Sequence, residues 1–159
     1  MAVLSFTSSK GGVGKSTACA SIAAALVSQR RKVLVLDLDQ NKTLMHWFRR
    51  APYPGLTVRD CSPADFTDIF RTEQESGRWD DILIDLAGAL DAAVLRAFLR
   101  ADLVIVPSGL SAPDLQQAML MVKHLHGLAE SADREPIPYR LLLTRVSPLG
   151  SRVANAMID

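Results

Sequence analysis

The chain has 159 residues, of which 48% are hydrophobic and 22% charged, a balance typical of one globular domain. The formal net charge of +1 excludes a strong overall attraction to nucleic acid or to an anionic membrane, but it allows a local basic patch. Two isolated cysteines, Cys19 and Cys61, indicate a reducing compartment, so we expect a cytoplasmic protein. The N-terminus does not resemble a signal peptide, and no apolar run is long enough to span a membrane.

Apolar runs and helix signals alternate along the chain. Strands are predicted at 3–8, 32–38, 81–86, 103–106 and 140–146, with a weaker one at 56–61. Helices are predicted at 16–29, after the capping signal of residues 62–65, and at 115–129, after a similar signal at 111–114. The continuous apolar strands are typical of a parallel sheet that is buried on both faces. We therefore predict an α/β fold, a mostly parallel twisted sheet with helices on both faces.

The strongest functional signal is a glycine-rich loop between the first strand and the first helix. Its glycines allow backbone N–H groups to converge on an anion, and the helix N-terminus adds partial positive charge. Lys15 can reach terminal phosphates and the Ser16 hydroxyl can bind Mg²⁺, although Ser9 stands where the P-loop pattern has its first glycine. We predict a P-loop NTPase that binds ATP or ADP with Mg²⁺. Its predicted nucleotide-binding residues are Gly11, Gly12, Val13, Gly14, Lys15, Ser16 and Thr17.

Acidic residues end two of the other predicted strands. Asp85 ends an apolar run, where a carboxylate is costly unless it is paired or lies near a cation, so we place it near Mg²⁺. Asp37 and Asp39 flank Leu38, so on a strand both would point the same way, at the end where α/β proteins bind ligands. Gly88 completes a D-x-x-G spacing that can present a backbone N–H to the γ-phosphate. Solvated acids and a plain turn glycine are the alternative interpretation.

The loop from Lys10 to Thr17 resembles the deviant Walker A motif of the ParA/MinD superfamily. Residues 33–39 resemble the D-x-D motif of that family, and Trp47 stands where some ParA proteins have a tryptophan. Residues 81–88 resemble the Walker B strand and the start of switch II, and two later strands also match, so the likeness spans nearly the whole chain. Within the superfamily, the chain looks most like the small ParA relatives that act in plasmid partition and T-DNA transfer.

The resemblance implies roles for the acidic residues and for Lys10. Asp37 would belong to the Mg²⁺ shell together with Ser16 and Asp85, and Asp39 would lie beside the attacking water. Lys10 would be the signature lysine, which reaches into the partner's site in an ATP-dependent homodimer and neutralises transition-state charge there.

Three residues are thus expected to act in catalysis, namely Lys10, Lys15 and Asp39. Thr144 and Arg145 are expected near the nucleotide base.

Two departures from the family pattern concern the chain's path and its length. Many ParA proteins read D-x-D-P-Q, whereas Gln40 and Asn41 follow Asp39 here, so the proline is missing. The family continues for several elements after the strand at 141–146. We therefore expect residues 1–159 to form one P-loop ATPase domain that lacks the usual C-terminal elements.

The resemblance implies a weak, partner-stimulated ATP hydrolase, a dimerising switch that positions or segregates DNA or another cargo. Its implied partners are a second copy of the chain, non-specific DNA and an ATPase-activating adaptor protein. Arg49 and Arg50 could contact DNA phosphates, although a solvated surface is the alternative. Two other functions stay open, a metabolic ATP-dependent ligase of the dethiobiotin synthetase type and a nucleotide-binding adaptor without turnover.

Overall fold

The computed structural model describes residues 1–88 and 92–146, in which strands and helices alternate as predicted. The strands are β1 (Ala2–Phe6), β2 (Val33–Asp37), β3 (Leu56–Asp60), β4 (Asp81–Asp85), β5 (Leu103–Ser108) and β6 (Tyr139–Leu143). The helices are α1 (Lys15–Ser28), α2 (Thr43–Arg50), α3 (Phe66–Glu75), α4 (Ala92–Arg100) and α5 (Ala112–Ser131). Residues 147–159 lie outside the described range, so the prediction of one domain over 1–159 stays a prediction.

All six strands form one parallel sheet in the order β3-β2-β4-β1-β5-β6, which confirms the predicted fold class. The central strand β1 lies between β4 and β5, so the loop that follows it leaves the middle of the sheet. The register pairs Phe6 with Asp85 and Asp85 with Asp37. The carboxyl ends of three adjacent strands therefore meet beside the glycine-rich loop, where ligands of open α/β sheets bind.

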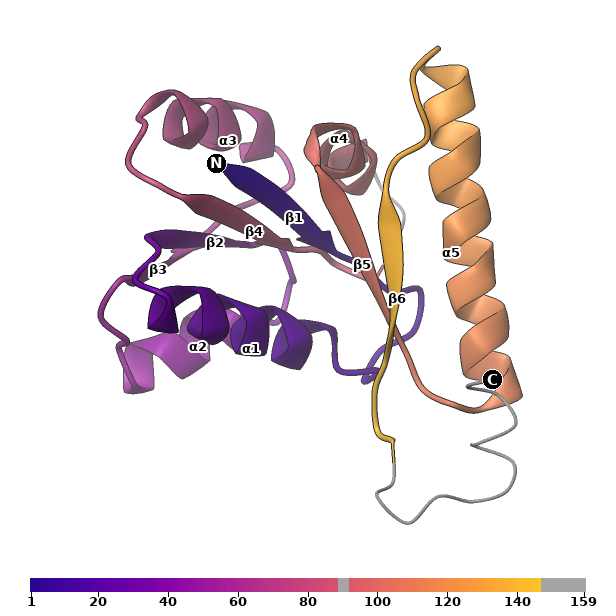
Figure 1. Ribbon diagram of the computed structural model, residues 1–159, viewed down its shortest axis with the longest axis horizontal. Coiled ribbons are helices and arrows are strands. Elements are labelled where there is room, and N and C mark those ends of the chain that lie inside the picture. The colour runs from indigo at the N-terminus through magenta and orange to yellow at the C-terminus, as the bar shows by residue number, and fades with distance from the viewer. Residues whose placement is uncertain (89–91, 147–159) are drawn as a thin grey trace.

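Helices cover both faces of the sheet, as Figure 1 shows, with α1 and α2 on one face and α3, α4 and α5 on the other. On the first face the small side chains of Ala18, Cys19 and Ala23 allow α1 to pack closely on the strands. On the second face the core is larger and includes Phe66 and Phe98. Among the helices in residues 1–88 and 92–146, none is both long and apolar enough to cross a membrane.

The two predicted capping signals have different outcomes. Ser111 is the N-cap of α5, where its hydroxyl accepts a hydrogen bond from the backbone N–H of Asp114. Ser62 makes the same contact with the N–H of Asp65, but there it closes a turn that precedes α3. Helix α3 begins later than predicted, at Phe66, because residues 62–65 form a separate turn.

Candidate nucleotide-binding site

The loop between β1 and α1 has the backbone geometry that its glycines predict. Gly12 and Gly14 have φ angles of 75° and 90°, in the left-handed region that glycine adopts without steric cost. Gly14 is also the N-cap of α1, and a Cβ on it would lie 3.5 Å from the Cγ2 atom of Thr144. Helix α1 starts at Lys15, so its unpaired N–H groups and its dipole directly follow the loop, an arrangement that favours anion binding.

A cavity of about 330 Å³ opens over this loop and brings together most of the residues predicted to bind nucleotide. Of the predicted residues it is lined by Lys10, Gly11, Gly12, Gly14, Lys15, Ser16, Thr17, Asp39 and Gly88. Val13 instead packs into the protein and is 5% exposed. Asn41, Thr43 and Trp47 also line the cavity, although the sequence analysis gave them no role in binding.

Lys15 lies between two carboxylates at the bottom of the site. Its Nζ atom is 2.7 Å from Oδ1 of Asp85 and 3.2 Å from Oδ2 of Asp39. Lys15 is 8% exposed and Asp85 is fully buried, so each charge needs the other to offset its desolvation. In this structure the ammonium group of Lys15 pairs with these two carboxylates, whereas the P-loop motif predicts that it binds phosphates.

The two carboxylates differ in their protonation equilibria. Burial raises the pKa of Asp85, and the neighbouring ammonium of Lys15 only partly opposes this effect. Burial acts in the same direction on Asp39, but hydrogen bonds from the N–H of Asn41 and the charge of Lys15 outweigh it and lower the pKa of Asp39. Asp39 is therefore the more readily ionised of the two.

The residues Ser16 and Asp85 fit a magnesium site. The Oδ2 atom of Asp85 is buried and has no hydrogen-bond partner among the described residues. The Ser16 side chain lies close enough to help hold down the pKa of Asp85. Mg²⁺ is usually held by one or two protein oxygens together with phosphates and waters, so it needs few ligands from the chain.

Asp37 has structural contacts that the sequence analysis missed. Its Oδ1 atom accepts a hydrogen bond from the N–H of Asp39 at 3.1 Å, and its Oδ2 atom accepts one from the N–H of Met45 at 3.0 Å. Asp37 is fully buried and caps the first turn of α2. We expected Asp37 and Asp39 to point the same way from one strand, but β2 ends at Asp37 and Asp39 lies beyond it. The place of Asp37 in the Mg²⁺ shell stays a prediction.

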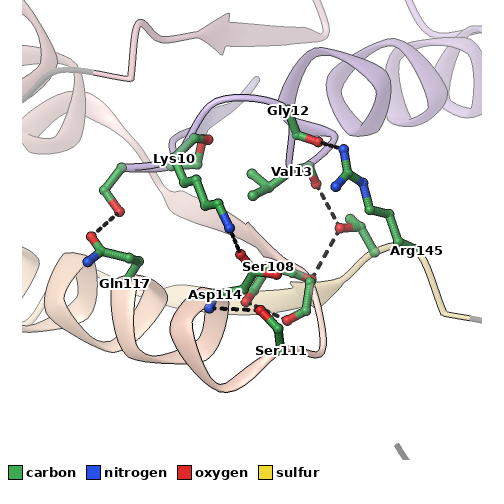
Figure 2. A network of polar contacts seen from close by, with 12 residues as sticks. Lys10, Gly12, Val13, Ser108, Ser111, Asp114, Gln117 and Arg145 are labelled. Carbon is green, nitrogen blue, oxygen red and sulfur yellow. Dashed lines mark hydrogen bonds and ion pairs between the residues drawn. The ribbon is translucent and has the colours of Figure 1, made fainter. Parts of the chain in front are cut away.

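Lys10 lies at the rim of the site and contacts its own chain. Its Nζ atom is 2.5 Å from Oδ1 of Asp114 in the first turn of α5 (Figure 2). The hydroxyl of Ser9 donates to Oε1 of Gln117 one turn further along, at 3.1 Å. Hydrogen bonds from Lys10 and Ser111 lower the pKa of Asp114, so this ion pair is formed at neutral pH. The sequence analysis had treated Asp114 only as a helix-start signal.

Thr144 and Arg145 hold the loop from the side of β6. The Thr144 hydroxyl lies 2.7 Å from the carbonyl oxygen of Val13 and 3.1 Å from that of Ser108, and Arg145 donates to the carbonyl of Gly12 (Figure 2). These contacts occupy loop carbonyls and leave the loop N–H groups for an anion. A contact with the base, which we expected for both residues, stays a prediction.

A second cavity, of about 540 Å³, adjoins the loop on this side. Its lining is largely apolar and includes Ala18, Ile22 and Leu142. Gly14 and Thr17 line both this cavity and the one over the loop, so the two cavities are neighbours.

Lys42 follows the Asp39 turn and makes contacts beside the site to which the sequence analysis gave no role. It is the N-cap of α2 and has a φ angle of 48°. Its Nζ atom donates to the carbonyl oxygens of Asp37 at 3.0 Å and Cys61 at 3.3 Å, and lies 2.6 Å from Oδ1 of Asp60. The sequence around Lys42 could not predict these contacts, because two of the acceptors, Asp60 and Cys61, lie at the end of β3 and directly after it.

Comparison with known proteins agrees with this geometry. Residues 4–159 match the family model described as the CobQ/CobB/MinD/ParA nucleotide binding domain. Protein ParA of Rhizobium radiobacter is 30% identical over 149 residues, which cover 93% of this chain and 66% of that protein. Protein virC1 of Rhizobium rhizogenes is 28% identical over 161 residues, which cover 94% of this chain and 66% of that protein. The chain therefore spans slightly less than two thirds of the length of these relatives.

A solved structure shows the same fold. The AMPPNP-bound structure of a Borrelia burgdorferi B31 protein, described as a plasmid partition protein, matches with a TM-score of 0.76 at 21% identity. The match covers 99% of this chain and 80% of that one. Because the family model covers almost all residues and the phosphate loop has the expected form, the chain belongs to the CobQ/CobB/MinD/ParA family of nucleotide-binding domains.

Proposed function

We propose that this protein is a ParA-like ATPase, an ATP-dependent dimerising switch that positions or segregates DNA or another cargo. The observation that carries this proposal is the pair of lysines on one phosphate loop. Lys15 is buried inside the site, whereas the side chain of Lys10 is 52% exposed at its rim. One cation is thus placed for the chain's own nucleotide, and the other is accessible to a second molecule.

ATP would bind with its phosphates at the N-terminus of α1. Lys15 would exchange Asp85 and Asp39 for phosphate oxygens, because a polyphosphate carries more negative charge than either carboxylate. Ser16 would bind Mg²⁺ directly, and the unpaired oxygen of Asp85 would hold it through water. The apolar cavity beside Thr144 would accommodate the base.

Hydrolysis would depend on positioning and charge neutralisation, which are the main requirements of phosphoryl transfer. Asp39 lines the phosphate cavity and its lowered pKa keeps it ionised, so it would orient the attacking water once Lys15 has moved away. Lys10 would leave Asp114 and stabilise the transition-state charge in the partner's site. The ion pair with Asp114 is largely solvent-accessible on the lysine side, and such pairs contribute little stability. A second nucleotide could therefore compete for Lys10.

The relatives favour this function over the alternatives. The curated relatives that match more than nine tenths of the chain include proteins named ParA, virC1 and Maintenance of carboxysome distribution protein A, and none of these is named as a ligase. A ligase of the dethiobiotin synthetase type would also have no use for Lys10 in a partner's site. An adaptor without turnover would not require the ionised Asp39 beside the phosphate cavity.

We propose the same partners and location as the sequence predicts. A homodimer with ATP would retain DNA non-specifically through basic residues such as Arg49 and Arg50 in the exposed last turn of α2. The affinity for DNA would then fall steeply with salt, because each phosphate contact releases counterions. An adaptor protein would accelerate hydrolysis. Both cysteines are free thiols, which agrees with a cytoplasmic location.

The experiment that tests this proposal measures phosphate release and molecular mass on the same protein. With Mg²⁺ and a slowly hydrolysed ATP analogue, light scattering should show the mass rise from 17.3 kDa to twice that value. With ATP, slow phosphate release should follow and should increase with DNA or a partner. Phosphate release only with a small organic acid would indicate the ligase, and tight binding without release would indicate the adaptor.

A further inference from the structure

The segment after β2 holds Asp39 in place without the proline that many ParA proteins have there. The N–H of Asp39 donates to the Asp37 side chain, and the N–H of Asn41 donates to the Asp39 side chain. The N–H of Lys42 donates to the carbonyl of Asp39 at 3.0 Å, which closes a turn. Short-range contacts therefore define the turn itself, and the N–H of Leu38, which donates to the carbonyl of Asp85 at 2.9 Å, links the start of the segment to β4.

The side chain of Lys42 supplies a second connection, from the end of the turn to β2 and β3. Its ammonium group donates to the carbonyl of Asp37 at the end of β2 and to that of Cys61 just after β3. The carbonyl of Asp37 also accepts from the N–H of Cys61, so Lys42 extends the pairing of the two strands by one more donor. Asp60 at the end of β3 pairs with the same ammonium group at 2.6 Å.

We propose that Lys42 is a positioning residue for ATP hydrolysis, which fixes the Asp39 turn to the ends of β2 and β3. The inference rests on the proposed hydrolase activity and deepens it. In the described structure Asp39 is also held by Lys15 at 3.2 Å. That contact is lost when Lys15 moves to the phosphates, so during catalysis the orientation of Asp39 depends on the turn and on Lys42.

The left-handed backbone of Lys42 offers a way to separate its side chain from its main chain. A φ angle of 48° is costly for lysine but not for glycine. Lys42→Gly therefore relieves the backbone and removes the ammonium group, whereas Lys42→Met keeps the long stem and removes only the charge and the donors. Lys42→Arg keeps a cation that can donate to carbonyls. Lys123→Met, on the exposed face of α5, is the matched control.

Two measurements test the proposal. In single-turnover hydrolysis, Lys42→Met and Lys42→Gly should lower the rate of phosphate release on the order of 10- to 100-fold, because a small displacement of a reacting group has effects of this size. Their affinity for ATP should match that of the parent, and Lys42→Arg should recover part of the rate. In the Asp39→Asn background, Lys42→Met should cause no further loss, since both changes act through one carboxylate.

Hydrogen exchange provides a readout that needs no turnover. Without nucleotide, the amides of Asp39, Lys42 and Met45 should exchange faster in Lys42→Met and Lys42→Gly, while those of α1 should not change. If Lys42→Met and Lys42→Gly both release phosphate at the parent rate, or if Lys42→Gly alone does so, the ammonium group has no role in hydrolysis. A parent protein that releases no phosphate would refute the hydrolase. In that case unchanged exchange in the variants would also refute the fixing of the turn, and faster exchange would support it.

Discussion

Lys15 is a buried cation whose partners are carboxylates in the described structure and phosphates in the proposed complex. Its contacts with Asp85 and Asp39 mean that removing it affects more than nucleotide binding. A buried carboxylate that loses its cation is strongly destabilising. Experiments on the site must therefore separate loss of stability from loss of binding.

Lys15→Ala should abolish ATP binding and lower the free energy of unfolding by about 3–5 kcal/mol, because it leaves Asp85 uncompensated. Calorimetric titration with ATP and urea denaturation measure the two effects. In the double variant Lys15→Ala/Asp85→Asn the buried charge is also removed. Part of the stability should then return, whereas ATP binding should not. Parent-like ATP affinity in Lys15→Ala would reject the phosphate site.

Asp39→Asn should leave ATP bound but slow its hydrolysis by about 10²-fold or more, the usual contribution of a residue that acts on the attacking water. The variant should accumulate as an ATP-bound dimer. Single-turnover phosphate release and light scattering measure both results. Asp68→Asn on α3, where the side chain of Asp68 is 78% exposed, is the control. A parent rate in Asp39→Asn means that another group orients the water.

At the scale of elements, α5 and β6 contact the phosphate loop from two directions. Lys10 pairs with Asp114 on α5, and Arg145 after β6 donates to Gly12 (Figure 2). The proposed dimer needs only the first of these contacts to open. The contact between Lys10 and Asp114 would therefore break during the ATPase cycle, whereas the contact between Arg145 and Gly12 would persist.

Changes at the two ends of the Lys10–Asp114 pair should have opposite effects. Lys10→Ala should bind ATP as a monomer and lose both dimerisation and hydrolysis, because the partner's phosphates lack a compensating cation. Asp114→Asn should release Lys10 and allow dimers at a lower protein concentration. Light scattering against protein concentration, with a slowly hydrolysed ATP analogue, tests both. Lys10 has no role in the partner's site if Lys10→Ala dimerises and hydrolyses ATP like the parent.

At the scale of the whole molecule, much of the architecture could be predicted from the sequence. Apolar runs such as 33–36 would place apolar side chains on both faces of a strand. This pattern is typical of a parallel sheet that is covered on both faces. The phosphate loop was predictable because its glycines and Lys15 act within one short segment. Lys10 and Asp114 are 104 positions apart, however, and no local pattern shows that they meet. The capping contact of Asp37 was missed because it depends on where β2 ends.

One buried acid far from the phosphate loop makes the stability depend on pH. Burial raises the pKa of Glu73, but hydrogen bonds from Trp79 and Arg59 and the charge of Arg78 outweigh it, so its net pKa is lowered. A lowered folded pKa means that this stabilisation is present above the pKa of an unfolded glutamate, about 4.3. It is lost as the pH falls through the lower folded value.

Glu73→Gln should therefore lower the free energy of unfolding by about 1–3 kcal/mol at pH 7, since Arg59, Arg78 and Trp79 lose an ionised acceptor. The difference from the parent should shrink at a pH below the unfolded pKa, as the pH falls through the lower folded pKa and the parent's carboxylate also becomes protonated. Urea denaturation at both pH values measures the change. Glu75→Gln, an exposed position of the same helix, is the control. An equal difference at both pH values would contradict the role of the Glu73 charge.

The two cysteines give the molecule a chemical reporter on each face of its sheet. Cys19 lies on α1 and packs into the core on that face of the sheet, and Cys61 belongs to the core on the opposite face. Burial raises the pKa of Cys61 to about 11 and raises the pKa of Cys19 well above its ordinary value, so neither thiol reacts readily with alkylating reagents in the folded state. Alkylation then proceeds through local opening, and the rates at the two thiols compare the opening of the two layers. A nucleotide that stabilises the phosphate loop and α1 should slow labelling of Cys19 more than labelling of Cys61.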